Sequence, residues 1–301
     1  MLMRIIPKPW FSFWRWRSGL LALCASVWLT GCGWLLQSTY NQSPRLVHYW
    51  LDDHFDFTEA QSEQAKALLK RWLAWHRQNA LPTVVNELNA WQALMAGSVD
   101  ADTVCQRFER ARGLTQSWFE PVVVDGAALA MSLSPKQLNH LRQTMAKRNA
   151  EWREEWLEGS ANDRLKRRVK QGREWAERWY GDLSQAQLDQ LRQAAQASPY
   201  SPELAFEWRK QRQGQWLGMW SRWQAQAPSP AEAQQALRDG LARWQQAPKP
   251  ADQALYARIQ RYNCEAVAAF HNRTTPAQRA HAVKVLQGYA DDVRALMAQT
   301  P

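Results

Sequence analysis

The sequence predicts an all-α fold, an elongated multi-helix bundle of about ten helices. Apolar residues recur at helical spacing among Gln, Ala, Arg, Leu and Glu residues. Strand signals are nearly absent. The β-branched run Val122-Val123-Val124 does not indicate a strand, because it follows Pro121 inside a helical pattern. In addition, several segments begin with the same local motif, a hydroxyl residue followed three positions later by Gln or Glu.

This motif is a capping box. The hydroxyl of its first residue accepts from the amide of its fourth, whose side chain in turn accepts from the first amide. Phe57, Leu133 and Leu183 each precede a box and are positioned for a hydrophobic staple. The five boxes are Thr58–Gln61, Ser134–Gln137, Ser184–Gln187, Thr275–Gln278 and Ser229–Glu232.

These starts and the apolar periodicity together indicate ten helical segments. We expect a disturbance near Pro44 in the first segment, a kink at Pro82 in the second, and interruptions at Pro121 and Gly126 in the third. The segments are 34–51, 59–96, 101–131, 135–158, 162–180, 185–197, 203–226, 230–246, 251–271 and 276–297.

The N-terminal residues form an export signal. A segment with four basic residues precedes the apolar run 20–29. An uncleaved membrane-spanning helix would need roughly 20 apolar residues, and ordinary cleavage would favour an A-x-A-like site, which is absent here. Leu29-Thr30-Gly31-Cys32 resembles the lipobox of bacterial lipoproteins. The resemblance implies that signal peptidase recognises Leu29, Thr30 and Gly31, and that Cys32 carries a diacylglycerol and an acylated amine, with palmitate among the chains.

From the predicted lipid anchor we infer where the protein is located and how its chain is divided. Residues 1–31 are a lipoprotein signal peptide, 32–58 a lipidated N-terminus with the first helix, and 59–301 an all-helical domain that could subdivide near 198–202. The resemblance implies a location in the cell envelope, facing the periplasm. Because Gly33 rather than Asp follows the cysteine, the bacterial sorting rule favours the outer over the inner membrane.

Charge indicates which partners to expect. The formal net charge is +10, but the signal carries four basic and no acidic residues, so the mature chain has 34 basic and 28 acidic residues. Anionic lipid headgroups or acidic sugars fit this mild excess better than nucleic acid, which an exported protein rarely meets. The alternative is an ordinary solvated surface.

Two cysteines remain after the signal and the anchor, Cys105 and Cys264. An even pair in an oxidising compartment favours one disulfide. The alternative is two buried free thiols.

Trp is abundant, with fifteen of nineteen residues in the mature chain. We expect most of these indoles to fill the core between helices, and pairs one turn apart, such as Trp152 with Trp156, to share a face. The functional alternative is an exposed Trp and Arg surface that binds unfolded chains, sugars or lipid headgroups by stacking and cation–π contact.

Asp52, Asp53 and Asp56 form the densest polar cluster near the anchor. They could bind a cation, but acidic residues before a helix also suit its dipole, and the Gly and distal Glu of a calcium loop are missing. The six His residues show no metal-ligand spacing, and no nucleophile elbow, P-loop or Rossmann fingerprint occurs. We therefore expect no catalytic residue, no metal and no cofactor beyond the covalent lipid.

The stretch 47–61, followed by Trp75-His76-Arg77 and Leu81-Pro82, resembles an uncharacterised family of all-helical bacterial lipoproteins. The Leu-Ser-x-x-Gln openings at Leu133 and Leu183 are also similar to the Leu-Thr-x-x-Gln motif of periplasmic stress chaperones, small helical cradles that bind unfolded clients.

The favoured hypothesis is a non-enzymatic, membrane-anchored periplasmic protein, chaperone-like, that binds an envelope protein client. The alternatives are a hydrolase that acts on envelope polymers and a purely structural tether. An exposed apolar groove rimmed by Arg would favour binding. The oligomeric state stays open.

Overall fold

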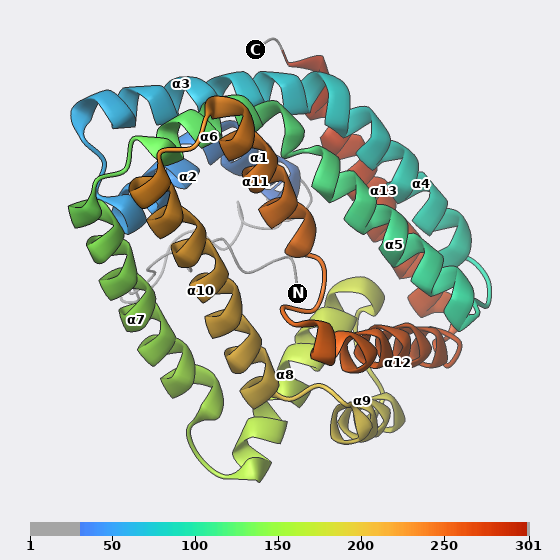
Figure 1. The fold of residues 1–301 in the computed structure, drawn as a ribbon. Helices are drawn as coiled ribbons and strands as arrows, with labels where there is room; N and C mark the ends of the chain where they lie inside the picture. Colours follow the sequence, from blue (N-terminus) through green and yellow to red (C-terminus); the bar gives the residue numbers. More distant parts are fainter. Residues whose placement is uncertain (1–30, 300–301) are drawn as a thin grey trace, which may run out of the picture.

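Helices and their connections account for all of the chain that the computed structural model describes, residues 31–299 (Figure 1). Side chains are described from residue 36 onward. No strand occurs within this range, which confirms the all-α prediction. Each predicted segment corresponds to one or two α-helices, and the first three segments are the divided ones.

The elements in chain order are α1 (Gly31–Asn41), α2 (Ser43–Phe55), α3 (Glu59–Trp75), the π-helix η1 (His76–Ala80), α4 (Leu81–Met95), α5 (Ala101–Ser117), the 3₁₀-helix η2 (Glu120–Val122), α6 (Val123–Met131), α7 (Pro135–Leu157), α8 (Ala161–Tyr180), α9 (Gln185–Ala197), α10 (Pro202–Gln226), α11 (Pro230–Arg243), the 3₁₀-helix η3 (Pro250–Asp252), α12 (Gln253–His271) and α13 (Pro276–Ala298).

Two of the expected helix interruptions are wrong in detail. The irregularity in the second segment is not a kink at Pro82 but the π-helix η1 before it, where the Leu81 amide bonds the His76 carbonyl five residues back. Pro82 lies in the first turn of α4, where a missing amide donor costs little. Gly126 does not interrupt the third segment, since it lies inside α6.

The helices of this multi-helix bundle follow one another around a broad frame (Figure 1). Helices distant in the sequence run side by side: α4 packs along α13, α5 along α12, α6 along α11 and α7 along α10. Long antiparallel contacts of this kind bury the apolar stripe of each helix against a partner.

Four apolar clusters lie between these paired helices, and each draws residues from both sides of the linker 198–202. In one cluster Met95 and Tyr180 pack with Phe270 and Leu286. The other three clusters join α4 to α13, α5 to α12 and α6 to α10 and α11. The two sides of the linker therefore depend on shared cores.

The five predicted capping boxes are all present. In each box the hydroxyl of the N-cap residue accepts from the N3 amide, and the N3 side chain accepts from the N-cap amide. A sixth box, formed by Ser160 and Asp163 at the start of α8, was not predicted. These caps satisfy amide donors that a helix start would otherwise leave unpaired.

Where α3 and α7 begin, the Gln residues of two boxes meet. Nε2 of Gln137 donates to Oε1 of Gln61 at 2.7 Å, and Nε2 of Gln61 lies 3.4 Å from Oε1 of Gln137. Each Nε2 also donates to a carbonyl just before the partner helix, from Gln61 to Ser132 at 3.0 Å and from Gln137 to Asp56 at 2.9 Å. Both side chains are buried, and the pairing satisfies the hydrogen-bonding groups of both amides.

The same arrangement recurs where α9 and α13 begin. Nε2 of Gln187 donates to Oε1 of Gln278 at 2.8 Å, and Gln278 donates back at 3.1 Å. Gln278 also donates to the carbonyl of Asp182, and Gln187 to that of Arg273. In both pairs the accepting carbonyl belongs to the residue two positions before the partner's N-cap. Two reciprocal glutamine pairs thus join four helix starts.

The contact between α10 and α11 depends on a glycine. A Cβ on Gly240 would lie 2.9 Å from Cη2 of Trp216, and this indole packs against Trp220. We expect Gly240→Ala to displace the indole and lower the free energy of unfolding by about 1–3 kcal/mol.

The control for this prediction is Gly172→Ala in α8, where a new Cβ has no neighbour within 4 Å. Ala at this position should raise the free energy of unfolding by about 0.5–1 kcal/mol through helix propensity. Denaturant unfolding measures both variants. Equal stabilisation by the two substitutions would contradict the packing argument.

Candidate functional site

The structure describes only the end of the motif Leu29-Thr30-Gly31-Cys32, which resembles a lipobox. Leu29 and Thr30 lie outside the described residues, while Gly31 and Cys32 form the start of α1. α1 contacts α2 and the C-terminal part of the chain in α13. Among the described residues, none of the helices combines the length and the apolar character that crossing a membrane requires.

Cys105 and Cys264 are joined in a disulfide that links α5 to α12, with a Cα–Cα distance of 5.4 Å. Of the two alternatives that the sequence left open, the structure has the bonded one. Cys264 is buried and packs in the core that contains Val104 and Ala268. In the chain-entropy model, a crosslink over 159 residues stabilises the folded state by about 5 kcal/mol.

The acidic residues near α2 are not brought together as a cation site. Asp52 Oδ1 accepts from the Phe57 amide at 3.2 Å, and Asp53 Oδ2 accepts from Arg148 at 3.0 Å. Asp56 ends α2 in the left-handed region, with φ at 50°. No group of three or more His, Cys, Asp or Glu in the described part of the chain could hold a metal ion.

Most of the described Trp side chains pack between helices. Trp208 and Trp223 are buried in α10, and the predicted one-turn pairs share a face, with ring centroids 6.3 Å apart for Trp152 and Trp156. Trp175 and Trp244 differ, because they are 42% and 52% exposed. Each has an arginine over its ring, Arg178 at 5.5 Å from Trp175 and Arg212 at 5.8 Å from Trp244.

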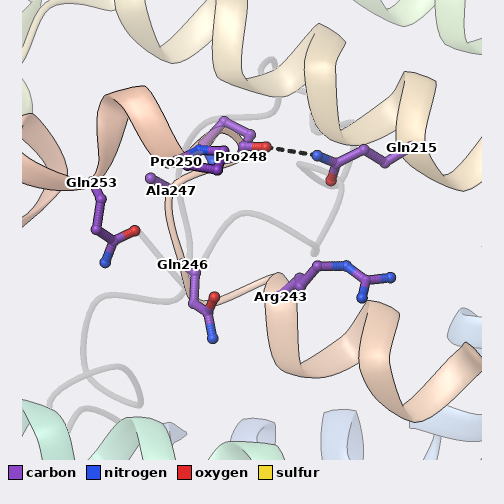
Figure 2. A pocket seen from close by; sticks show the side chains of 7 residues that line it. All are labelled: Gln215, Arg243, Gln246, Ala247, Pro248, Pro250 and Gln253. Atoms are coloured by element: carbon purple, nitrogen blue, oxygen red, sulfur yellow. Dashed lines mark hydrogen bonds between the residues drawn. The ribbon is translucent and has the colours of Figure 1, made fainter. Parts of the chain in front are cut away.

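A pocket of about 420 Å³ lies between α10 and the linker from α11 to α12 (Figure 2). Trp244 follows the lining residue Arg243 in the chain but does not itself line the pocket. Figure 2 shows Gln215 of α10 reaching the linker, where its Nε2 donates to the Pro248 carbonyl at 2.7 Å. The volume of the pocket lies within the range of small-ligand sites. The lining residues are Gln215, Arg243, Gln246, Ala247, Pro248, Pro250 and Gln253.

The pocket presents polar groups that the described residues leave free. The side chains of Arg243, Gln246 and Gln253 make no hydrogen bond or ion pair within this part of the protein, and none of the lining residues is acidic. Arg212 of α10 donates to the backbone carbonyl of the lining residue Gln246 at 2.9 Å. Burial lowers the pKa of Arg212 from its ordinary value. The lining thus offers amide side chains and the guanidinium of Arg243, and the exposed indole of Trp244 follows Arg243 in the chain.

A second polar cluster lies around the π-helix. Oη of Tyr40 lies 3.0 Å from Nδ1 of His76, and Trp118 contacts the same imidazole. Arg77 donates to the Asn41 side chain at 2.6 Å and lies over the Tyr40 ring. Burial lowers the pKa of His76 to about 4 and raises that of Tyr40 to about 12, so both are neutral at neutral pH.

His271 is engaged in the same manner. Its Nδ1 lies 3.0 Å from the Tyr180 hydroxyl, and Nε2 donates to the Gly97 carbonyl at 2.7 Å. Burial lowers the pKa of this imidazole as well. Both His residues have their ring contacts within the fold, which assigns them to structural support.

Sequence reasoning missed the pocket and the buried His76 cluster. Trp75-His76-Arg77 stands out in the sequence, but a π-helix leaves no spacing signature that separates it from the surrounding α-helices. The pocket is lined by Gln215 of α10 and Gln253 of α12, two helices that are separated in the sequence. The signal that could have pointed to it is the Pro248-Lys249-Pro250 linker next to Arg243 and Trp244.

The comparisons with known proteins fix the family of the chain. The model of a family described as "Family of unknown function (DUF6279)" matches residues 53–247, more than half of the 301-residue chain, so the chain belongs to that family. No curated protein and no solved structure matches the chain. Membership of an uncharacterised family, one part of the sequence-based resemblance, is therefore confirmed.

The buried imidazole of His76 predicts a pH dependence of stability. Because its pKa falls from 6.5 unfolded to about 4 folded, its contribution is complete above pH 6.5 and is lost as the pH falls from 6.5 towards 4. Between pH 7 and about pH 5, protonation of the unfolded chain at this site costs the fold about 2 kcal/mol.

His76→Asn retains an acceptor for the Tyr40 hydroxyl but does not titrate, so it should remove this share of the pH dependence. The control is His281→Asn, since His281 is exposed on α13. Denaturant unfolding at pH 7 and at lower pH measures the effect. The assignment would be wrong if both variants kept the dependence of the native chain.

Proposed function

We propose that this protein is a lipoprotein of the bacterial cell envelope whose helical domain faces the periplasm and binds an envelope protein client without catalysing a reaction. The motif Leu29-Thr30-Gly31-Cys32 after a basic and apolar segment carries the anchor. The disulfide between Cys105 and Cys264 supports an oxidising compartment independently of that motif. Gly33 after the cysteine favours the outer membrane.

Binding is supported by the side chains that line the pocket and by the exposed Trp244, which follows the lining residue Arg243 in the chain. Amide side chains both donate and accept, as a polypeptide backbone requires of its partner. The exposed indole of Trp244, next to Arg243 in the chain, supplies apolar contact area at low entropic cost, and the Arg243 side chain in the pocket favours segments that carry carboxylates. An extended, partly apolar segment of an unfolded or unassembled envelope protein has this chemistry.

The chemistry of the titratable side chains supports a role without catalysis. His76 and His271 are buried, neutral and engaged with Tyr40 and Tyr180. A general base would need a pKa near the working pH and access to a substrate proton. In the alternative as a hydrolase of envelope polymers, carboxylates or imidazoles would have to converge in a cleft.

The anchor is tested by mass spectrometry of the mature N-terminus in the native chain and in Cys32→Ala. We expect a chain that begins at Cys32 and carries two or three acyl groups in the native protein, and loss of this species in the variant. An uncleaved N-terminus, or cleavage elsewhere, would remove the anchor and the compartment from the proposal.

Client binding is tested by suppression of aggregation of a chemically unfolded model protein. We expect the native chain to suppress it and Trp244→Ala to lose at least about half of the suppression, since exposed aromatic anchors dominate such contacts. The matched control is Trp175→Ala, another exposed indole beneath an arginine but in α8, away from the pocket.

Equal losses in the two variants would contradict the assignment to the pocket. An absence of suppression by the native chain would contradict chaperone-like binding altogether and favour a structural tether.

A further inference from the structure

The apolar side chains that the fold leaves exposed gather near the anchor. Eight large apolar side chains are exposed among the described residues, and six of them lie in α2, at η2 and α6, and at the end of α13. α3 contacts α2, η2 and α6, and α1 contacts α2 and α13. In Figure 1 α1, α2, α3, α6 and the C-terminal end of α13 lie in the upper part of the molecule, whereas α8 and α9 lie in its lower part.

The densest group is on α2. Leu46, Tyr49 and Trp50 follow the i, i+3, i+4 spacing of one helix face, and they are 45%, 73% and 41% exposed. The helix also packs on α3 and α7, and His54, one turn after Trp50, is buried with its ring centroid 4.1 Å from that of Trp50. Leu46, Tyr49 and Trp50 thus keep a large exposed area on α2 within the described chain.

From this placement we propose that the outward face of α2, formed by Arg45, Leu46, Tyr49 and Trp50, lies in the headgroup layer of the membrane to which the protein is anchored. This inference rests on the proposed lipid on Cys32. Leu46 follows Cys32 by 14 residues, and Cys32 lies in the first turn of helix α1, which has 11 residues. Such a helix is about 16 Å long, so the face stays close to the acylated end.

The chemistry of the face fits this occupant. Trp and Tyr prefer the boundary between headgroups and acyl chains, because each ring has an apolar body and a polar tip. Arg45 is exposed and has no acidic partner among the described residues, so its guanidinium is free for lipid phosphates. The neighbouring acids are engaged, Asp52 with the Phe57 amide and Asp53 with Arg148.

Met297 adds a further exposed apolar side chain at the end of α13, beside α1. A surface of this kind, held next to a lipid anchor, contributes a second membrane contact that fixes the orientation of the domain.

The test uses the full lipidated chain in vesicles of phosphatidylethanolamine and phosphatidylglycerol. Tyr49→Cys supplies a free thiol for a nitroxide label, because Cys105 and Cys264 are bonded to each other and Cys32 carries the lipid in the proposed form. Trp175→Cys, exposed on α8, is the matched control. Collision rates with oxygen, which partitions into lipid, and with a water-soluble nickel chelate are measured by electron paramagnetic resonance.

We expect the ratio of oxygen to nickel collisions to be at least about twofold higher at position 49 than at position 175. Equal ratios at the two positions would overturn the membrane contact, and protection of position 49 from both reagents would overturn it in favour of a second protein. Mass spectrometry of the same samples reads the lipid separately. An unacylated Cys32 would overturn the anchor itself, whereas an acylated Cys32 with equal ratios would overturn only this inference.

Discussion

The reciprocal hydrogen bonds between capping-box glutamines are the interaction on which the arrangement of the helices depends. Gln61 with Gln137, and Gln187 with Gln278, each cap their own helix while bonding the cap of another. A buried primary amide left unpaired would cost about 1–3 kcal/mol, so each pair strongly disfavours separation of the two helix starts. The side chain that caps its own helix therefore also makes a contact with a helix that is distant in the sequence.

Besides the two glutamine pairs, contacts between distant parts of the chain hold the helices together. The disulfide ties α5 to α12, and α4 packs along α13 with Leu81 and Val85 against Val293 and Leu296. Since each core draws on both sides of the linker 198–202, the helices form a mutually dependent frame. This frame holds α10 against the linker that forms the pocket, and α2 with its exposed face beside α1.

The sequence predicted what is encoded locally. Capping boxes and helix starts depend on residues three positions apart, so Thr58 and Gln61 were sufficient to place the start of α3. Which box would pair with which could not be predicted, because Gln61 and Gln137 are 76 residues apart and nothing in their spacing distinguishes partners. The pocket likewise depends on tertiary packing of Gln215 and Gln253. For Asp52, Asp53 and Asp56 the sequence analysis weighed a cation site against helix-dipole support and expected no metal, and in the structure Asp52 accepts from the Phe57 amide and Asp53 from Arg148.

The most direct test of this account is a double-mutant cycle on Gln61→Met and Gln137→Met, read by denaturant unfolding. Met retains the length of the side chain and the helix propensity, and loss of each capping contact cancels in the cycle. The account predicts a coupling free energy of about 1–2 kcal/mol, with the double variant less destabilised than the sum of the single ones, because each single variant leaves one amide unpaired. Additivity to within about 0.5 kcal/mol would contradict the view that the glutamine pairs join the helix starts.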